Sequence, residues 1–364
     1  MIKPTDKISL AENASYEDED FQDIPPVDIV AYNELRSCAD LYRMYEDDTL
    51  DIKPDYQRDI AWKGPAQTRF IDSLIKQLPI PSLCFSYDYK KEKWQVIDGL
   101  QRISSIIRFL DPTSDWIMAG LEDVDPRIAN KKVTEFQRRG SDLNKLKRRV
   151  ENATLPITIL RCDPSLESHA NYLFTIFHRL NTGGTKLNNQ EIRNCIFSGN
   201  FNNLLKELDQ NKKWLKINRK KIYTNDRFKR QELILRFFAF SEKFEDYKEG
   251  LAKFLNNYMR SNRSISVTEI DEKRQIFTRV IEALAAKLGK ELARERLNLS
   301  LLEALLVGVA RNIQTVEGLT QEQAAQRFKN LKENDEFTEE KLVGGLSKTA
   351  RVMGRLKAAV QIFG

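Results

Sequence analysis

The segment Trp94-Gln95-Val96-Ile97-Asp98-Gly99-Leu100-Gln101-Arg102 decides the fold of the N-terminal half of this chain. A short apolar run ends on an acid and a glycine, and apolar residues then recur at Ile103, Ile106, Ile107 and Leu110. This spacing predicts one face of an amphipathic helix that follows directly on a strand. Backbone N–H groups at such a helix start bind anions, and Arg102 in the first turn adds a charged fork. A capped helix with a surface salt bridge is the alternative explanation.

Two further motifs flank this segment in the sequence. Upstream, Tyr56-Gln57-Arg58 lies shortly before Trp62, and we expect it to present polar side chains from a loop or a strand end. Downstream, Asn181-Thr182-Gly183-Gly184 supplies two glycines that tolerate positive φ, and Asn188 with Glu191 fits a capping box for the next helix. The alternatives are a Tyr56 and Trp62 that pack in the core, and a plain turn between two helices.

In this order, the three blocks resemble the N-terminal domain family of GmrSD-type, modification-dependent restriction endonucleases, within the ParB/sulfiredoxin-like superfamily. The family's Tyr-Gln-Arg motif falls on residues 56–58 and its Asp-Gly-Gln-Gln-Arg motif on residues 98–102. Two positions depart from the pattern, since Lys53 stands where the family usually has an apolar residue, and Leu100 replaces the first glutamine. Any nucleotide contact that this glutamine makes in relatives therefore differs here, while the phosphate-facing residues are retained.

The resemblance implies nucleotide binding and, in some relatives, hydrolysis. We therefore expect a nucleoside triphosphate, with or without Mg²⁺, as the cofactor, and no separate set of metal ligands. Arg102 is predicted to hold phosphates, Asp98 to cap the helix or hold a metal, and Gln101 to orient water. The remaining predicted nucleotide-binding residues are Gly99, Leu100, Tyr56, Gln57, Arg58, Asn181, Thr182, Gly183 and Gly184.

Charge is distributed unevenly along the chain. The net charge is +6, but residues 1–51 carry a balance of −10, which leaves +16 on the remainder. Residues 206–230 hold ten basic and three acidic side chains, interleaved with Trp214, Tyr223 and Phe228. This mixture predicts a DNA partner, bound by Lys212, Lys213, Arg219, Lys220 and Lys221. A basic helical hairpin with buried aromatic residues is the alternative.

Several patterns exclude other classes of protein. The four cysteines are widely separated, so neither a zinc knuckle nor a disulfide framework is expected. Residues 344–349, Gly-Gly-Leu-Ser-Lys-Thr, have the letters of a P-loop in the wrong spacing, so the predicted NTPase lacks a P-loop. We find neither a signal peptide nor a membrane span in the sequence, and expect a soluble, cytoplasmic protein without a membrane partner.

The expected fold class is α+β, with a ParB/sulfiredoxin-like N-terminal domain followed by a mainly helical C-terminal domain. We predict an acidic, disordered arm over residues 1–20, the nucleotide-binding domain over 21–200 and the helical domain over 201–364. Strands are predicted at 82–87, 93–97 and 155–160, and helical spacing occurs within 32–45, 166–180, 231–244, 276–288, 301–310 and 341–362.

The predicted role is nucleotide-dependent DNA sensing in a bacterial antiviral or modification-dependent restriction system, with the nuclease supplied by a partner protein. One alternative is an autonomous metal-dependent DNA nuclease that uses Asp98 and other acids. The other is a non-catalytic, nucleotide-gated DNA-binding switch that resembles a ParB-like clamp. No oligomeric state is predicted.

Overall fold

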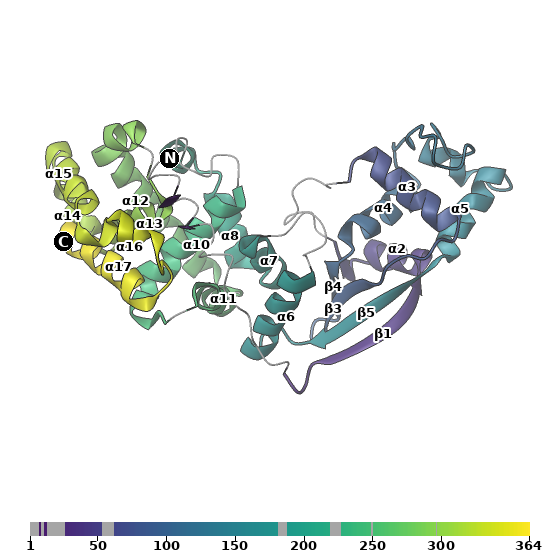
Figure 1. The fold of residues 1–364 in the computed structure, drawn as a ribbon, viewed down its shortest axis with the longest axis horizontal. Helices are drawn as coiled ribbons and strands as arrows, with labels where there is room; N and C mark the ends of the chain where they lie inside the picture. The colour runs from purple at the N-terminus through teal and green to yellow at the C-terminus, as the bar shows by residue number, and fades with distance from the viewer. Residues whose placement is uncertain are drawn as a thin grey trace. The chain divides into compact units, whose positions relative to one another are not determined.

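The computed structural model divides the chain into two compact units, whose elements are labelled in Figure 1. Residues 23–187 form one, which we call the α+β unit, and residues 1–22 with 188–364 form the other, which we call the helical unit. The structure describes residues 7–8, 11–12, 26–52, 62–180, 188–218, 227–248, 250–295 and 297–364. The α+β fold class is confirmed.

The α+β unit is built on a five-stranded mixed sheet with the strand order β1-β5-β3-β4-β2. Its strands are β1 (Val30–Ser37), β2 (Leu50–Asp51), β3 (Leu83–Asp88), β4 (Lys93–Asp98) and β5 (Thr154–Cys162). β3 and β4 form the predicted antiparallel hairpin, and β3 lies parallel to β5, with Leu83 opposite Ile157. β1 and β2 are the two edge strands, and β1 pairs antiparallel with β5 while β2 pairs parallel with β4.

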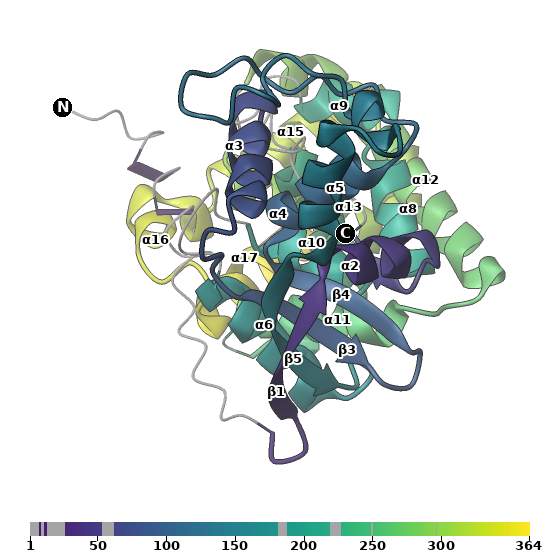
Figure 2. The same cartoon turned by 90° about the vertical axis from the view of Figure 1, so that its right-hand side faces the viewer.

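Helices cover this sheet and supply most of its core. They are α2 (Cys38–Glu46), α3 (Gly64–Ile75), α4 (Leu100–Leu110), α5 (Asp142–Asn152) and α6 (Glu167–Leu180), with a 3-10 turn at Val133–Gln137. α3, α4 and α5 gather on one side of the strands in Figures 1 and 2, and α6 packs against β4. Ile103 and Ile106 of α4 are fully buried, and Ile107 and Leu110 are nearly so, which confirms the predicted apolar face.

The helical spacing predicted within residues 32–45 is wrong for its first part. Val30–Ser37 is a strand that pairs with β5 along its whole length, from Val30 opposite Arg161 to Ser37 opposite Thr154. Pairing with a distant strand overrides the local spacing, because β structure depends on its neighbours more than on intrinsic preference. The helix begins at Cys38, where the Ser37 hydroxyl accepts a hydrogen bond from the Asp40 N–H at 3.0 Å.

The helical unit is formed by α7 to α17. Their bounds are α7 (Asn189–Ile196), α8 (Asn200–Leu208), α9 (Lys212–Asn218), α10 (Arg227–Lys243), α11 (Leu251–Asn262), α12 (Val267–Arg294), α13 (Leu299–Arg311), α14 (Ile313–Gly318), α15 (Gln321–Lys332), α16 (Glu339–Val343) and α17 (Thr349–Phe363). The continuous helical spacing predicted over 341–362 is interrupted between α16 and α17, where Gly345 has a φ of 62°. α16 ends at Val343, its C-cap Gly344 is extended, and the left-handed Gly345 follows before α17 begins at Thr349.

α13 is the central helix of this unit and packs against α10, α12 and α17. Gly308 of α13 sits so close to α17 that a Cβ there would lie 2.8 Å from the Ala359 carbonyl oxygen. A side chain at this position would push the two helices apart, so glycine sets their close approach.

A buried ionic network joins α7, α10 and α13. The Glu232 carboxylate pairs with Arg193 at 2.9 Å and with Arg236 at 2.6 Å, and Arg236 also reaches Glu303 at 3.3 Å. Burial works to raise the pKa of Glu232, but the guanidinium groups of Arg236 and Arg193 outweigh it and hold the pKa below its ordinary value. Each charge in the network therefore depends on its partners, and removing one leaves another buried without compensation.

Glu12 belongs to the segment for which a disordered arm is predicted, and its side chain is fully buried against α13. Its carboxylate accepts hydrogen bonds from the Ser300 N–H at 2.8 Å and the Leu299 N–H at 3.1 Å, and from the Ser300 hydroxyl at 2.9 Å. Burial raises the pKa of Glu12. Of residues 1–20 the structure describes only 7–8 and 11–12, so the disordered arm as a whole stays a prediction.

Candidate functional site

The predicted turn between strand and helix is present at the end of β4. The strand stops at Asp98, Gly99 takes a φ of 97°, and α4 starts at Leu100. A Cβ at Gly99 would lie 2.1 Å from Leu83 Cδ2, and a β-bulge interrupts the hairpin between Cys84 and Phe85 beside this point. Both the left-handed backbone and the close approach require glycine at position 99.

Arg102 folds back over this turn. Its Nη2 donates to Asp98 Oδ2 at 2.9 Å and to the Ser82 carbonyl oxygen at 3.3 Å, and its Nη1 donates to the Pro81 carbonyl oxygen. The side chain is only 14% exposed, and burial lowers the pKa of its guanidinium, against the opposing effect of the Asp98 carboxylate. Among the described residues Nε has no hydrogen-bond partner, so the fork keeps a donor for an anion.

The proposed helix-capping role of Asp98 is wrong. Gly99 is the N-cap residue and α4 has no side-chain cap, because the Asp98 carboxylate turns to Arg102 instead. The salt bridge of the alternative explanation is therefore present, although its cap is not. The Asp98 side chain is 41% exposed and remains accessible to a ligand. Among the described residues, no cluster of three or more His, Cys, Asp or Glu side chains is arranged to hold a metal ion.

The two residues between Gly99 and Arg102 point in different directions. Leu100 is 7% exposed, so its side chain belongs to the core and only its backbone can face a ligand. Gln101 Oε1 accepts a hydrogen bond from the Trp62 N–H at 3.2 Å. The Trp62 ring lies edge-on to Phe70, with the ring centroids 5.7 Å apart. This contact agrees with the alternative in which Trp62 packs against core residues. A role of Gln101 in orienting water stays a prediction.

The two flanking motifs lie outside the described residues, namely Tyr56, Gln57 and Arg58 in one and Asn181, Thr182, Gly183 and Gly184 in the other. The described neighbours of the first motif are both anchored near the turn. Asp51 pairs with Gln95 of β4, and Trp62 donates to Gln101 of α4. The described neighbour that follows the second motif is Asn188, which forms the predicted capping box with Glu191.

Sequence reasoning did not identify the two carbonyl acceptors of Arg102. Pro79 and Pro81 restrict the backbone before β3, and Pro81 and Ser82 then offer their carbonyl oxygens to a guanidinium that comes from α4. A proline pair in the sequence signals a rigid segment, but it does not reveal which side chain will use its carbonyl groups.

The candidate DNA-binding residues belong to the helical unit. Lys212 and Lys213 lie on α9, where Lys213 pairs with Glu282 at 2.6 Å, whereas Arg219, Lys220 and Lys221 lie outside the described residues. The aromatic side chains of this region do not serve as an exposed stacking surface, since Trp214 is 0% and Phe228 2% exposed. For these two rings the buried-aromatic alternative is confirmed.

A comparison with protein families matches residues 38–198 to the family described as GmrSD restriction endonuclease, N-terminal domain. Over these residues the chain is similar to the GmrSD N-terminal domain family. The match runs from the start of α2 to two residues past the end of α7 and contains the Asp98–Arg102 turn. No curated protein and no solved structure matched the chain, so the ParB/sulfiredoxin-like assignment stays a prediction.

A GmrSD N-terminal domain indicates a component of a restriction system. None of the described helices combines the length and the apolar character that crossing a membrane requires.

Proposed function

We propose that this chain is the nucleotide-dependent DNA-sensing component of a bacterial restriction or antiviral system, and that a partner protein supplies the nuclease. The observation that carries the proposal is the Asp98–Arg102 turn within a GmrSD N-terminal domain. Three features are together suited to a nucleoside triphosphate: a helix start, a half-exposed acid, and a mostly buried arginine whose Nε has no partner among the described residues.

In this proposal Arg102 and the first N–H groups of α4 hold the phosphates. Asp98 orients the Arg102 fork through the contact at 2.9 Å and is exposed enough to meet a Mg²⁺ ion carried by the nucleotide. Gln101 lies in the same first turn and would position the attacking water. Residues 56–58 and 181–184 would complete the site, and Lys212 and Lys213 of α9 would bind DNA together with Arg219, Lys220 and Lys221.

The test measures phosphate release from each of the four common nucleoside triphosphates, with and without DNA. The variants are Arg102→Ala, Arg102→Lys and the control Arg69→Ala, which removes an exposed arginine paired with Asp123 in the same unit. We expect DNA-stimulated release that both Arg102 variants lose and the control keeps, because lysine retains the charge but not the fork.

Other outcomes separate the alternatives. Nucleotide binding without turnover would favour the non-catalytic switch. Metal-dependent nicking of DNA by the isolated chain would favour the autonomous nuclease. Equal nucleotide binding and release by wild type and Arg102→Ala would refute the site.

A further inference from the structure

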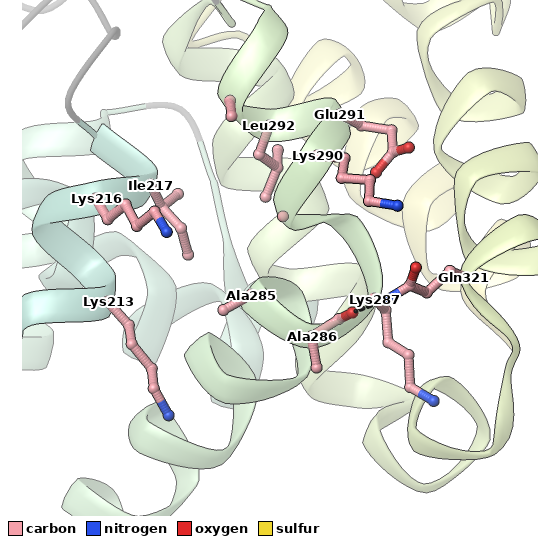
Figure 3. A pocket seen from close by; sticks show the side chains of 12 residues that line it. Lys213, Lys216, Ile217, Ala285, Ala286, Lys287, Lys290, Glu291, Leu292 and Gln321 are labelled. Carbon is pink, nitrogen blue, oxygen red and sulfur yellow. Dashed lines mark hydrogen bonds between the residues drawn. The ribbon is translucent and has the colours of Figure 1, made fainter.

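A pocket of about 550 Å³ opens in the helical unit between α9, the second half of α12 and the start of α15, as Figure 3 shows. A volume of this size lies within the range of about 300–1,000 Å³ that is typical of small-molecule sites. The pocket lies in a different unit from the Asp98–Arg102 turn. It shares Lys213 with the DNA-binding residues proposed above, but a pocket for a single nucleotide goes beyond that function.

The floor of the pocket is made by small side chains on one face of α12. Ala285, Gly289 and Ala293 follow each other at intervals of four residues, and Ile217 of α9 and Leu292 add an apolar wall. Residues four apart lie on the same face of a helix, so the three positions leave a shallow, flat surface. A planar ring can approach such a surface closely.

Gly289 is the most informative residue of this floor. It lies inside a 28-residue helix, where glycine is unfavourable compared with alanine. Its φ is not positive, and an added Cβ would meet no atom within 4 Å, so neither backbone conformation nor packing demands a glycine there. The lack of a side chain at Gly289 does have one effect, which is to keep the pocket open.

The rim of the pocket is strongly basic. Lys213 and Lys216 project from α9, and Lys287 and Lys290 from α12, against a single lining carboxylate, that of Glu291. Lys213 is engaged by Glu282, and Lys287 donates to the Leu319 carbonyl oxygen, which is uncharged. Counting Glu282 as well, the side chains in and around the pocket keep a net charge of +2. A positive rim above an apolar floor suits an anion with an attached ring.

We propose that this pocket binds a nucleoside monophosphate unit, with the base on the α12 floor and the phosphate between the lysines of α9 and α12. The unit has two possible sources with the same chemistry, a free mononucleotide or the 5′-phosphorylated end of a DNA strand. Either source would give the helical unit a nucleotide site of its own, separate from the one in the GmrSD N-terminal domain.

The test is photolabelling of the full chain with 8-azidoadenosine 5′-monophosphate, followed by mapping of the labelled peptides. We expect label within residues 213–217 or 285–293, and labelling about tenfold weaker in Gly289→Leu, whose side chain stands on the floor where the base would lie. The double variant Lys216→Gln/Lys290→Gln removes charge-assisted contacts and should weaken labelling by about the same factor. No atom lies within 4 Å of the new Cβ in Gly289→Leu and the site borders the open pocket, so we expect this variant to fold, as its urea denaturation midpoint would show.

Two matched controls isolate the cause. Gly289→Ala removes the glycine without filling the pocket, and Lys253→Gln removes an exposed lysine on α11, so both should label like wild type. Competition with unlabelled adenosine monophosphate alone identifies a free nucleotide as the source. Competition by a 5′-phosphorylated oligodeoxythymidine, and not by its 5′-hydroxyl form, identifies a strand end.

Three results would overturn the proposal. They are equal labelling of these peptides in wild type and Gly289→Leu, labelling that neither competitor reduces, and label confined to other peptides. Label on the peptide that contains residues 98–102 would report on the site in the other unit and would not support this one.

Discussion

Replacing Gly99 with alanine should destabilise the α+β unit and disturb the candidate nucleotide site together. The φ of 97° costs an L residue roughly 1–2 kcal/mol. The new Cβ would also lie 2.1 Å from Leu83 Cδ2, and overpacking of this kind costs about 1–3 kcal/mol. The expected loss in the free energy of unfolding is therefore about 2–5 kcal/mol.

The assay is urea denaturation of the full chain, detected by hydrogen exchange in peptides from residues 93–110. These peptides report on the α+β unit alone, which matters because a chain of two units need not unfold in one step. The matched control is Gly64→Ala at the start of α3, where an added Cβ meets no atom within 4 Å and φ is not positive. A Gly99→Ala variant whose unfolding free energy stays within about 0.5 kcal/mol of wild type would refute the reasoning.

Because burial raises the pKa of Glu12, docking of its segment onto α13 should strengthen as the pH falls from neutral toward the ordinary glutamate pKa and weaken as the pH rises through the raised value. Hydrogen-exchange protection factors of the Leu299 and Ser300 amides should show this trend in wild type and lose it in Glu12→Gln. A trend of the opposite sign would contradict the assignment. Burial raises the pKa of the Cys38, Cys84 and Cys162 thiols to about 12. Iodoacetamide at pH 8 should therefore label all three cysteines in urea and none in the native protein, which mass spectrometry of the alkylated peptides measures. Rapid labelling of any of them in the native protein would show that its burial is incomplete. Gly308→Leu should destabilise the helical unit by about 1–3 kcal/mol, since the new side chain meets the α17 backbone at Ala359. The midpoint of urea denaturation, followed by hydrogen exchange in α13 peptides, should drop for this variant and not for the control Gly289→Ala.

Local signals were strong enough in the sequence to predict several elements correctly. The apolar spacing after Gly99 predicted α4, the alternation on either side of a charged turn predicted the β3–β4 hairpin, and Asn188 with Glu191 predicted the start of α7. Each of these features depends on residues within a few positions of one another, so short-range chemistry is sufficient to specify it.

The tertiary structure decided what those local elements contact. The strand at Val30–Ser37 exists because β5 lies beside it, although the paired residues are 117 to 131 positions apart in the sequence, and local spacing alone suggested a helix. Arg102 donates hydrogen bonds to the carbonyl groups of Pro81 and Ser82, and the Asp98 carboxylate accepts from the Arg102 guanidinium and does not cap the helix. These contacts depend on which distant segments the fold brings together, and not on residues adjacent in the sequence.

The same division holds for the helical unit. The sequence by itself determined that residues 206–230 are basic and that the C-terminal part is mainly helical. Only the tertiary structure decided that Trp214 is a core residue, and that lysines from α9 and α12 meet around a floor kept open by Gly289. The physical reason is that charge and helical periodicity are properties of the chain, whereas burial and a pocket depend on which faces the fold brings together.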